Sequence, residues 1–390
     1  MNGLEVIGDI PVKRTKQHDI QRRDNGERPG NQAHHLPTGQ RRQGEESAEP
    51  APCERLHTRT VHSRRISGCS PPPDEFECAS VVVGVADRFW EQTGMDRSSA
   101  IQDFAVRHGF TGLRPLGRGL EFQVFRATTP GGAEVVLRTP AGARFESNLN
   151  DPRVDTRRLL RWEDTVARHL DGLGFPVAKA HSLFRGQPDV LVSEFVPDDG
   201  RGADQRRLGA VLRRLHRLPP PQQRPVAEEG TTVTELLPTR IVRRWTALAD
   251  LVPGLPRPPA YTDMAAALAN RPMNRLLHLD VRAANLRCVG GEVRGLLDWS
   301  NALIADPLLE LARLAEFARL PDNELDLTEI LAGYGTPEVP DSLAAWVYRL
   351  DAAVMLAVVF ASEAPDAELG PRAVERLCEV HTGFRTRLNL

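Results

Sequence analysis

Apolar and polar positions follow two different patterns along the chain, and the pattern changes near residue 95. Up to about residue 78 the sequence is rich in Arg, Gln, Glu, His, Pro and Gly and has no sustained apolar period. Such a segment cannot bury enough apolar area to offset the entropy cost of ordering it. We therefore expect residues 1–94 to be a disordered extension, or an upstream translation that the working protein lacks, with Met95 as a candidate start.

Beyond residue 95 the first pattern is rich in strands. "SSAIQDFAVRHG" has helical spacing and ends at Gly109, and "LRPLGRGLEFQVFRATTPGGAEVVLRTP" then contains three strand-like stretches separated by glycine turns. "DTRRLLRWEDTVARHLDGLG" has the apolar period of an amphipathic helix. "VAKAHSLF" and "DVLVSEFV" are two further strands around an "RGQP" turn. The order β-β-β-α-β-β predicts a small antiparallel sheet that carries one helix.

The remainder of the chain is mainly helical. "QRRLGAVLRRLHRL" has its apolar residues on one face, and the prolines at 219–221 end it. "LRCV" and "VRGLLD", joined by Gly290–Gly291, predict one hairpin inside this helical part. Further helices are predicted over 231–250, 261–269, 307–319, 324–333, 341–361 and 371–386. The fold class is therefore α+β, with a β-rich part before an α-rich part.

Charge and hydropathy exclude some classes of partner. The net charge of -2 gives no overall attraction to nucleic acid or to an anionic membrane. The apolar stretch at Ala352–Ala361 is too short to span a bilayer, and the chain does not start as a secretory signal does. We expect a cytoplasmic protein without membrane or nucleic-acid partners. The alternative, nucleic-acid binding through the Arg-rich extension, predicts binding that disappears when residues 1–94 are deleted.

Cysteine and lysine usage bears on which bonds, metal sites and charged residues the protein can use. The 5 cysteines are irregularly spaced and odd in number, which does not indicate a disulfide framework. No CxxC pair occurs, so a zinc site built on Cys53, Cys69 and Cys78 with nearby histidines is disfavoured. Lysine is almost absent while arginine is abundant. Arg can therefore stand where Lys normally acts, although its planar fork differs from a point charge.

Chemistry-bearing residues gather in "HLDVRAAN", residues 278–285. Asp280 can orient a substrate hydroxyl and accept its proton late in a transfer, and Asn285 offers an amide oxygen suited to Mg²⁺. Asp298 follows 13 residues after Asn285, at the end of an apolar strand, and offers a second oxygen ligand. Together they suit Mg²⁺-dependent phosphoryl transfer. The alternative is a polar turn, because Asp and Asn are common turn residues and Asp298 can cap the next segment.

"HLDVRAANLRCVGGEVRGLLDWSNALIADPLLELA" resembles the His-x-Asp-x4-Asn loop, the Asp-Trp pair and the x-Asp-Pro motif of the aminoglycoside phosphotransferase/choline kinase family. The resemblance covers roughly residues 100–390. It implies a two-lobed protein-kinase-like fold: a small antiparallel N-lobe with one helix at residues 95–197, and a mainly helical C-lobe at residues 198–390. It also implies ATP and Mg²⁺ as cofactors and a small-molecule acceptor as the partner.

The same resemblance implies a role for each polar residue. Asp280 is expected to be the catalytic base, and Asn285 and Asp298 are expected to hold Mg²⁺. His278 is expected to be a buried prop of the loop. Asp306 is expected to cap the helix that follows it.

The β-rich part is expected to supply the nucleotide site. "GRGLEFQV" fits the kinase glycine-rich pattern except that its third glycine is a phenylalanine. Gly117 and Gly119 are expected to let backbone amides approach the phosphates, and an ordinary turn is the alternative. Arg138 occupies the place of the lysine on the third strand, and Glu163 on the next helix is expected to pair with it. Asp164 is another candidate partner of Arg138. The alternative is that Arg138 and Glu163 are both exposed and unpaired.

Three further positions complete the implied site. Arg282 stands where many protein kinases carry a lysine that contacts the transferred phosphate, and we assign it to the catalytic set. Leu279 replaces the usual glycine of the loop. "LVSEFVPDDG" resembles the hinge between lobes, where the main chain of Glu194 and Val196 is expected to bind adenine.

The acceptor region beyond Ser300 is acidic, which implies a cationic acceptor such as an aminoglycoside or an amino alcohol. A solvated helix face is the alternative. Choline, which needs an aromatic cage, is not favoured at an aromatic content of 5%. We expect a small-molecule phosphotransferase. The competing hypothesis is a catalytically inactive kinase-like nucleotide-binding or regulatory module, which the arginine at 138 and the irregular glycine loop motivate. The acidic residues beyond Ser300 from which a cationic acceptor is implied are Glu310, Glu316, Asp322, Glu324, Asp326 and Glu329.

Overall fold

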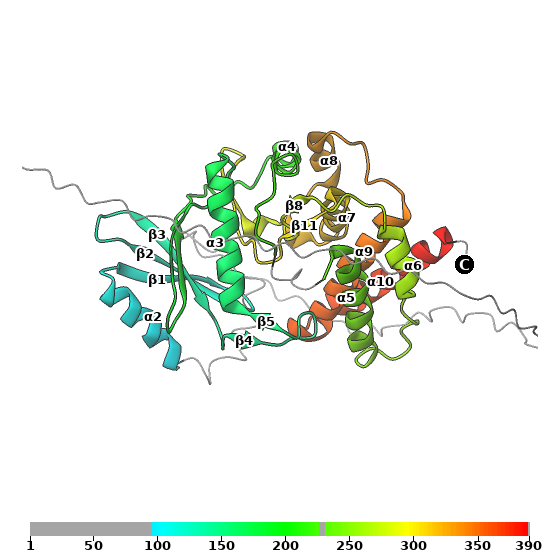
Figure 1. Cartoon of the computed structure of the whole chain (residues 1–390), viewed down its shortest axis with the longest axis horizontal. Coiled ribbons are helices and arrows are strands. Elements are labelled where there is room, and N and C mark those ends of the chain that lie inside the picture. Colours follow the sequence, from blue (N-terminus) through cyan, green and yellow to red (C-terminus); the bar gives the residue numbers. More distant parts are fainter. Residues whose placement is uncertain (1–94, 226–230, 389–390) are drawn as a thin grey trace, which may run out of the picture. The chain divides into compact units, whose positions relative to one another are not determined.

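The structure, a computed structural model, describes residues 95–225 and 231–388. The predicted extension, residues 1–94, lies outside the described residues, and so do its three cysteines. The described part has a sheet-containing N-lobe and a mainly helical C-lobe (Figure 1). This arrangement confirms the predicted α+β fold class.

The N-lobe is a five-stranded antiparallel sheet with the strand order β1-β2-β3-β7-β6. This order confirms the predicted succession of three strands, a helix and two strands. The elements are α2 (Met95–Arg107), β1 (Thr111–Arg118), β2 (Phe122–Thr128), β3 (Glu134–Pro140), α3 (Thr156–Gly172), β6 (Ala180–Phe184) and β7 (Val190–Glu194).

The two helices of this lobe cover opposite faces of the sheet. Val190 and Val192 of β7 belong to a buried cluster with Ile101 of α2. Leu191, which lies between them, belongs to a different cluster that contains Leu160 of α3. Successive strand residues point to opposite faces, so this alternation places α2 on one face and α3 on the other.

A small hairpin that the sequence did not predict lies between β3 and α3. Its strands are β4 (Phe145–Glu146) and β5 (Val154–Asp155). The Asp155 side chain then accepts hydrogen bonds from the backbone N–H groups of Arg157 and Arg158 at 3.1 and 3.3 Å and so caps α3. Two-residue strands are too short to show an alternating pattern in the sequence.

The C-lobe contains the predicted helices and hairpin. Gly290 and Gly291 join β9 to β10 with φ values of 59° and 75°, a conformation that glycine adopts without strain. The elements are α4 (Gln205–Leu215), α5 (Val233–Ala249), α6 (Tyr261–Leu268), β8 (Arg275–Leu277), β9 (Leu286–Val289), β10 (Glu292–Leu296), β11 (Leu303–Ala305), α7 (Pro307–Phe317), α8 (Leu327–Tyr334), α9 (Leu343–Val358) and α10 (Leu369–Arg387).

Two local features differ from the sequence prediction. The short strand β8 pairs with β11, a pairing that the sequence did not predict. The helix expected from residue 324 begins three residues later, because a 3-10 turn at Pro321–Asn323 precedes it and the Asp326 side chain caps α8.

One apolar core joins the lobes and fixes the β9–β10 hairpin against the sheet. Leu160 and Trp162 of α3 share a buried cluster with Leu208 of α4 and Leu296 of β10. The Leu296 N–H also donates a hydrogen bond to the Pro176 carbonyl at 3.0 Å. This contact matters for function because Asp298 follows two residues after Leu296.

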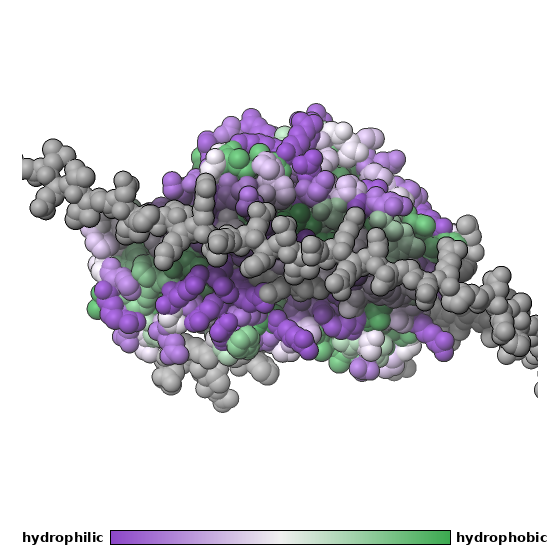
Figure 2. Space-filling model, viewed as in Figure 1, coloured by the Kyte–Doolittle hydropathy of each residue, from purple (hydrophilic) through white to green (hydrophobic). Residues whose placement is uncertain are grey.

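Among the described helices, one is long and apolar enough to cross a membrane by length and composition, Leu343–Glu363, with a mean hydropathy of 1.8. Within this segment, 67% of the most apolar window is buried inside the protein. Its α9 residues line the C-lobe core. On the visible face of the described part, hydrophilic residues predominate and apolar residues form small patches (Figure 2). The segment therefore has the surroundings of a core helix.

Candidate active site

The predicted catalytic loop begins directly after β8 with a fully buried histidine. His278 Nδ1 accepts a hydrogen bond from the Asp280 N–H at 3.1 Å, and Nε2 lies 2.8 Å from the Leu297 carbonyl. Because Nδ1 is the acceptor, the hydrogen-bond network assigns the ring proton to Nε2. His278 thus ties the loop to the strand end before Asp298, which is the geometry of the predicted prop.

A buried glutamate holds the backbone of the same loop. Glu310 on α7 accepts hydrogen bonds from the N–H groups of His278 and Leu279 at 2.9 and 2.6 Å. Burial would raise the pKa of Glu310, but its hydrogen bond with His216 and the nearby charges hold that pKa below its usual range. Leu279 has φ of 65°, in the left-handed region where glycine is favoured. The Glu310 contacts therefore stabilise a backbone conformation that leucine rarely adopts.

Asp280 and Asn285 lie in direct contact. The Asn285 amide nitrogen donates to both the backbone carbonyl and the carboxylate of Asp280, each at 2.8 Å. Arg282 Nε lies 3.4 Å from Asp280 Oδ1. The Asp280 side chain is 14% exposed, so the carboxylate is oriented yet accessible to a small molecule. Asp280, Asn285 and Arg282, which belong to one loop in the sequence, thus also lie in contact with one another.

Asp298 follows β10 in a strained conformation. Its φ is 63°, and its Oδ1 accepts hydrogen bonds from Arg138 at 2.9 Å and from the Ser300 hydroxyl at 2.7 Å. Burial would raise the pKa of Asp298, but the Arg138 charge and these hydrogen bonds lower it to about 2. The Leu297 N–H donates to the Asn285 carbonyl at 2.8 Å, which brings Asn285 and Asp298 onto neighbouring segments.

Arg138 links the lobes through two carboxylates. Besides Asp298, it contacts Glu163 on α3, with Nε and Oε2 3.2 Å apart. These two atoms lack the alignment of a hydrogen bond, so the contact is an ion pair by distance alone. The Arg138 guanidinium also lies over the Phe122 ring at 4.4 Å. The predicted partner of Arg138 is therefore Glu163, and Asp164 pairs with Arg168 instead.

The carboxylates around Arg138 outnumber its single positive charge. Burial raises the pKa of Glu163 to about 7, against the lowering effect of Arg138. Glu121, in the turn of the glycine-rich loop, has its pKa raised to about 7 by burial and by the charge of Asp298. The sequence did not single out Glu121, because a polar residue in a turn between strands carries no distinctive signal.

This donor set fits Mg²⁺. Among the described residues, hydrogen bonds reach only Oδ1 of Asp298 and only the amide nitrogen of Asn285, which leaves one oxygen of each side chain for a cation. The same part of the chain holds no cluster of three His, Cys, Asp or Glu residues for a metal. Mg²⁺ binds through one or two carboxylates together with phosphates and water, so a full protein cage is not required.

The four positions predicted to contact the nucleotide lie in the glycine-rich turn and in the hinge. Gly117 lies in β1, and a Cβ there would meet no described atom within 4 Å. The Gly119 N–H donates to the Phe122 carbonyl at 2.8 Å. The Glu194 N–H donates to the Lys179 carbonyl at 2.8 Å, and Val196 is buried. These positions stay predictions for nucleotide contacts.

Comparison with known proteins decides the family. The sequence profile of the phosphotransferase enzyme family matches residues 112–346, which is more than half of the chain. The chain belongs to this phosphotransferase family. No curated protein matches it by sequence.

Solved structures place the phosphotransferase in the kinase-like fold. A thermostable mutant of aminoglycoside phosphotransferase APH(4)-Ia, in a ternary complex with AMP-PNP and hygromycin B, matches with a TM-score of 0.51 and 16% identity over 73% of this chain and 98% of that chain. The apo form of such a mutant matches with a TM-score of 0.51 and 17% identity over 72% of this chain and 98% of that chain. At these identities the likeness shows the fold alone.

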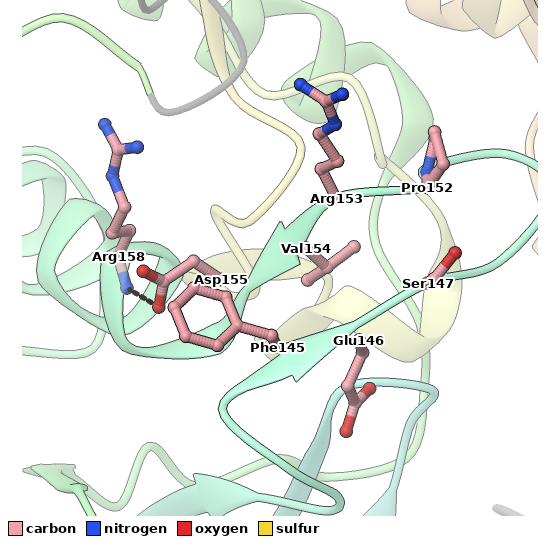
Figure 3. A pocket seen from close by; sticks show the side chains of 8 residues that line it. All are labelled: Phe145, Glu146, Ser147, Pro152, Arg153, Val154, Asp155 and Arg158. Carbon is pink, nitrogen blue, oxygen red and sulfur yellow. Dashed lines mark hydrogen bonds between the residues drawn. The ribbon is translucent and has the colours of Figure 1, made fainter.

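A cavity of about 450 Å³ lies at the β4–β5 hairpin of this phosphotransferase (Figure 3). The guanidinium groups of Arg153 and Arg158 extend to the same side of it, and the Phe145 ring lies beside Asp155. None of the predicted catalytic, metal or nucleotide residues lines this cavity. The chemistry is therefore expected at the Asp280 loop and not here.

Two of the acidic residues beyond Ser300 are buried partners of other groups in the phosphotransferase. Glu310 accepts hydrogen bonds from the Asp280 loop, and Glu316 pairs with Arg349 and Arg376 at 2.7 and 2.8 Å. Asp326 caps α8, and Glu329 pairs with Arg206 on the surface. Asp322, Glu324 and Asp326 are exposed, and the cationic acceptor stays a prediction.

Proposed function

We propose that this enzyme transfers the γ-phosphate of ATP to a hydroxyl of a small molecule in a Mg²⁺-dependent reaction. The observation that carries the proposal is a chain of contacts: Asn285 contacts Asp280, its segment adjoins that of Asp298, and Asp298 pairs with Arg138, which also contacts Glu163. Membership of the phosphotransferase family supports the reaction class. The AMP-PNP and hygromycin B bound to a relative of the same fold support a nucleotide and a small molecule as the two substrates.

The residues of the chain divide the chemical work. Asp280 orients the acceptor hydroxyl, whose oxygen attacks the γ-phosphorus while the bond to the β,γ-bridging oxygen breaks. Asp280 takes the hydroxyl proton late in this step, and ADP leaves. Arg138 and Arg282 stabilise negative charge that spreads over the transferred phosphoryl group. Asn285 keeps the Asp280 carboxylate in place through its amide donor.

Asn285 and Asp298 are the residues that would hold Mg²⁺. When bound there, the cation neutralises phosphate charge and fixes the direction of transfer. The excess of carboxylate around Arg138 supports a cation at this place, because Glu121 and Glu163 both have pKa values raised to about 7. The main chain of Gly117, Gly119, Glu194 and Val196 would contact the nucleotide.

The test is ADP release by the full chain with ATP, Mg²⁺ and a panel of hydroxyl acceptors, for the wild type and for Asp280→Ala. We expect the substitution to lower kcat by about 10²- to 10⁴-fold, since a positioned base contributes that much. Asp250→Ala, which changes an exposed carboxylate after α5, is the matched control and leaves turnover unchanged. Near wild-type turnover by Asp280→Ala would contradict the proposal. ATP binding without turnover across the panel would favour the inactive-module hypothesis.

A further inference from the structure

A second group of buried charges lies in the C-lobe and has no part in the steps above. We call it the arginine cluster: Arg240, Arg243 and Arg244 on α5 and Arg313 on α7. All but Arg243 are buried. Buried arginines normally occur with matching carboxylates, because an unpaired charge is costly to remove from water.

The cluster has too few carboxylates. Arg240 forms a two-point ion pair with the fully buried Asp351 of α9, and Arg244 and Arg313 share the same carboxylate at 3.3 and 3.8 Å. The other ion-pair partner is Asp151, at 3.8 Å from Arg243 and 3.9 Å from Arg244. Within the part of the chain that the structure describes, the four guanidinium groups thus form ion pairs with two carboxylates.

Arg313 is the least satisfied member. Its side chain is 8% exposed, its Nε has no hydrogen-bond partner among the described residues, and its guanidinium lies over the Phe317 ring at 5.0 Å. Its nearest charged partner is Asp351 at 3.8 Å, beyond hydrogen-bond distance. Burial lowers the pKa of Arg313, and burial together with the charge of Arg240 lowers the pKa of Arg244 to about 10. Both shifts indicate positive charges that lack compensation.

The donors of the cluster already converge on an oxygen atom. Arg243 and Arg244 both donate to the Asn150 carbonyl, in the loop between β4 and β5. Arg243 is 38% exposed and Asp151 is 59% exposed, so the cluster is open to solvent at this edge. A carbonyl oxygen is a weak partner for two guanidinium groups, whereas a carboxylate or phosphate accepts charge-assisted hydrogen bonds from both.

The cluster lies beside the predicted transfer site. Arg313 follows Glu310 by one turn of α7, so the two side chains lie on the same face of this helix. Glu310 accepts a hydrogen bond at 2.6 Å from the N–H of Leu279, the residue before Asp280. In agreement with this placement, the charge of Asp280 acts on Arg313. An acceptor whose hydroxyl is held by Asp280 would therefore place its other end next to these arginines.

We infer that the acceptor carries an anionic group, a carboxylate or a phosphate ester, which the arginine cluster binds while the hydroxyl is presented to Asp280. This inference rests on the proposed function and narrows its acceptor class. Arg313 and Arg243 supply the unused donors, and Arg244 adds a third guanidinium between them. Among the described residues, the two buried carboxylates Glu310 and Glu316 are committed to internal partners and so are not available to an amino sugar.

The experiment uses the full chain with ATP and Mg²⁺ and compares four acceptor sets of similar size: hydroxy carboxylates, sugar phosphates, neutral sugars and amino sugars. ADP release gives kcat and KM, and calorimetric titration of each compound gives binding. We expect turnover and binding with hydroxy carboxylates, with sugar phosphates, or with both. Preference for one of these two sets identifies the anion.

Variants then assign the site. Arg313→Gln and Arg243→Gln each remove charge-assisted hydrogen bonds, so KM for the anionic acceptor is expected to rise about 10- to 100-fold. The KM for ATP and the KM for any neutral acceptor are expected to stay unchanged. Arg243 is partly exposed, so its variant keeps the fold even if the buried Arg313→Gln does not. Arg319→Gln, at an exposed position after α7, is the matched control.

The outcomes separate this inference from the proposed function. Amino sugars or neutral sugars as the preferred acceptors, with KM unaffected in both variants, would overturn the anionic acceptor and leave phosphotransfer intact. Anion binding that weakens in the variants, without any turnover, would keep the anion site and overturn phosphotransfer. Absence of anion binding to the wild type would overturn the site itself.

Discussion

Two buried charge clusters flank the catalytic loop, and their balances are opposite. In the first, the single guanidinium of Arg138 lies among Glu163, Asp298 and Glu121. In the second, the arginine cluster of four guanidinium groups shares Asp351 and Asp151. The excess of carboxylate in the first cluster favours the proposed Mg²⁺, and the excess of guanidinium in the second favours the inferred anionic group of the acceptor.

The difference shows that each buried cluster of this phosphotransferase lacks enough side chains of the opposite charge to balance it. A protein that kept both clusters for stability alone would gain by replacing them with apolar residues, because buried ion pairs contribute little net stability. The unbalanced buried charge instead indicates a functional role for both clusters. The predictions below change one cluster at a time and ask whether the other responds.

The largest effect is expected from Asp298→Asn in the first cluster. Asparagine tolerates the left-handed backbone of this position, so the fold is kept while one negative charge is lost. We expect kcat to fall about a thousandfold, because the metal would lose its charged ligand. Titration of ADP release with Mg²⁺ checks this, with Asp250→Asn as the control. An unchanged Mg²⁺ requirement at unchanged kcat would remove Asp298 from the metal site.

The second cluster is tested by Asp351→Ala. The change leaves Arg240, Arg244 and Arg313 without their shared carboxylate, so unfolding free energy is expected to fall by at least about 3 kcal/mol. Urea unfolding measures the loss. The double variant Arg240→Leu with Asp351→Leu removes the pair together and is expected to be more stable than the single variant. A loss below about 1 kcal/mol in Asp351→Ala would show that these arginines are not electrostatically coupled to Asp351.

The sequence predicted the first cluster better than the second for a physical reason. Asp280, Asn285 and Asp298 are close along the chain, so their spacing already describes the loop. Glu310 was missed as a partner of the loop backbone, and Glu121 was missed as a member of the charge cluster around Arg138, because both depend on partners from distant segments.

The arginine cluster was out of reach for a related reason. Arg240, Arg243 and Arg244 have the spacing of one helix face, which is also the spacing of an ordinary solvated surface. Only the packing of α5 against α9 shows that this face is buried and that Asp351 forms ion pairs with its arginines. The strands and helices of the fold, in contrast, follow local periodicity, and the sequence therefore predicted most of them.

A pH prediction tests the excess of carboxylate in the first cluster. Glu163 has its pKa raised from 4.5 to about 7, so the folded state binds more protons than the unfolded state between these values. Its contribution to stability is complete below pH 4.5 and is lost as pH rises through 7. For the nucleotide-free protein this amounts to a loss of about 2 kcal/mol from pH 5 to pH 7.

Glu163→Gln is expected to reduce this slope, with the remainder due to Glu121, whose pKa is also raised to about 7. Thermal unfolding at pH 5, 6 and 7 (a range around the usual carboxyl and imidazole pKa values) measures the slope for both proteins. Saturating ATP and Mg²⁺ are expected to flatten it in the wild type, because a bound cation favours the ionised carboxylates. Equal slopes for the wild type and the variant would place Glu163 outside the charge balance.

The smallest effect is expected from Arg138→Lys, which asks whether the first cluster needs charge or the guanidinium fork. Lysine keeps the positive charge but cannot contact Glu163 and Asp298 with separate nitrogens, as Arg138 does. Loss of one such contact, about 1 kcal/mol, raises KM for ATP about fivefold. Arg138→Gln, which removes the charge as well, is the comparison and is expected to raise KM further. Equal KM values in the two variants would mean that the fork, and not the charge, binds the nucleotide.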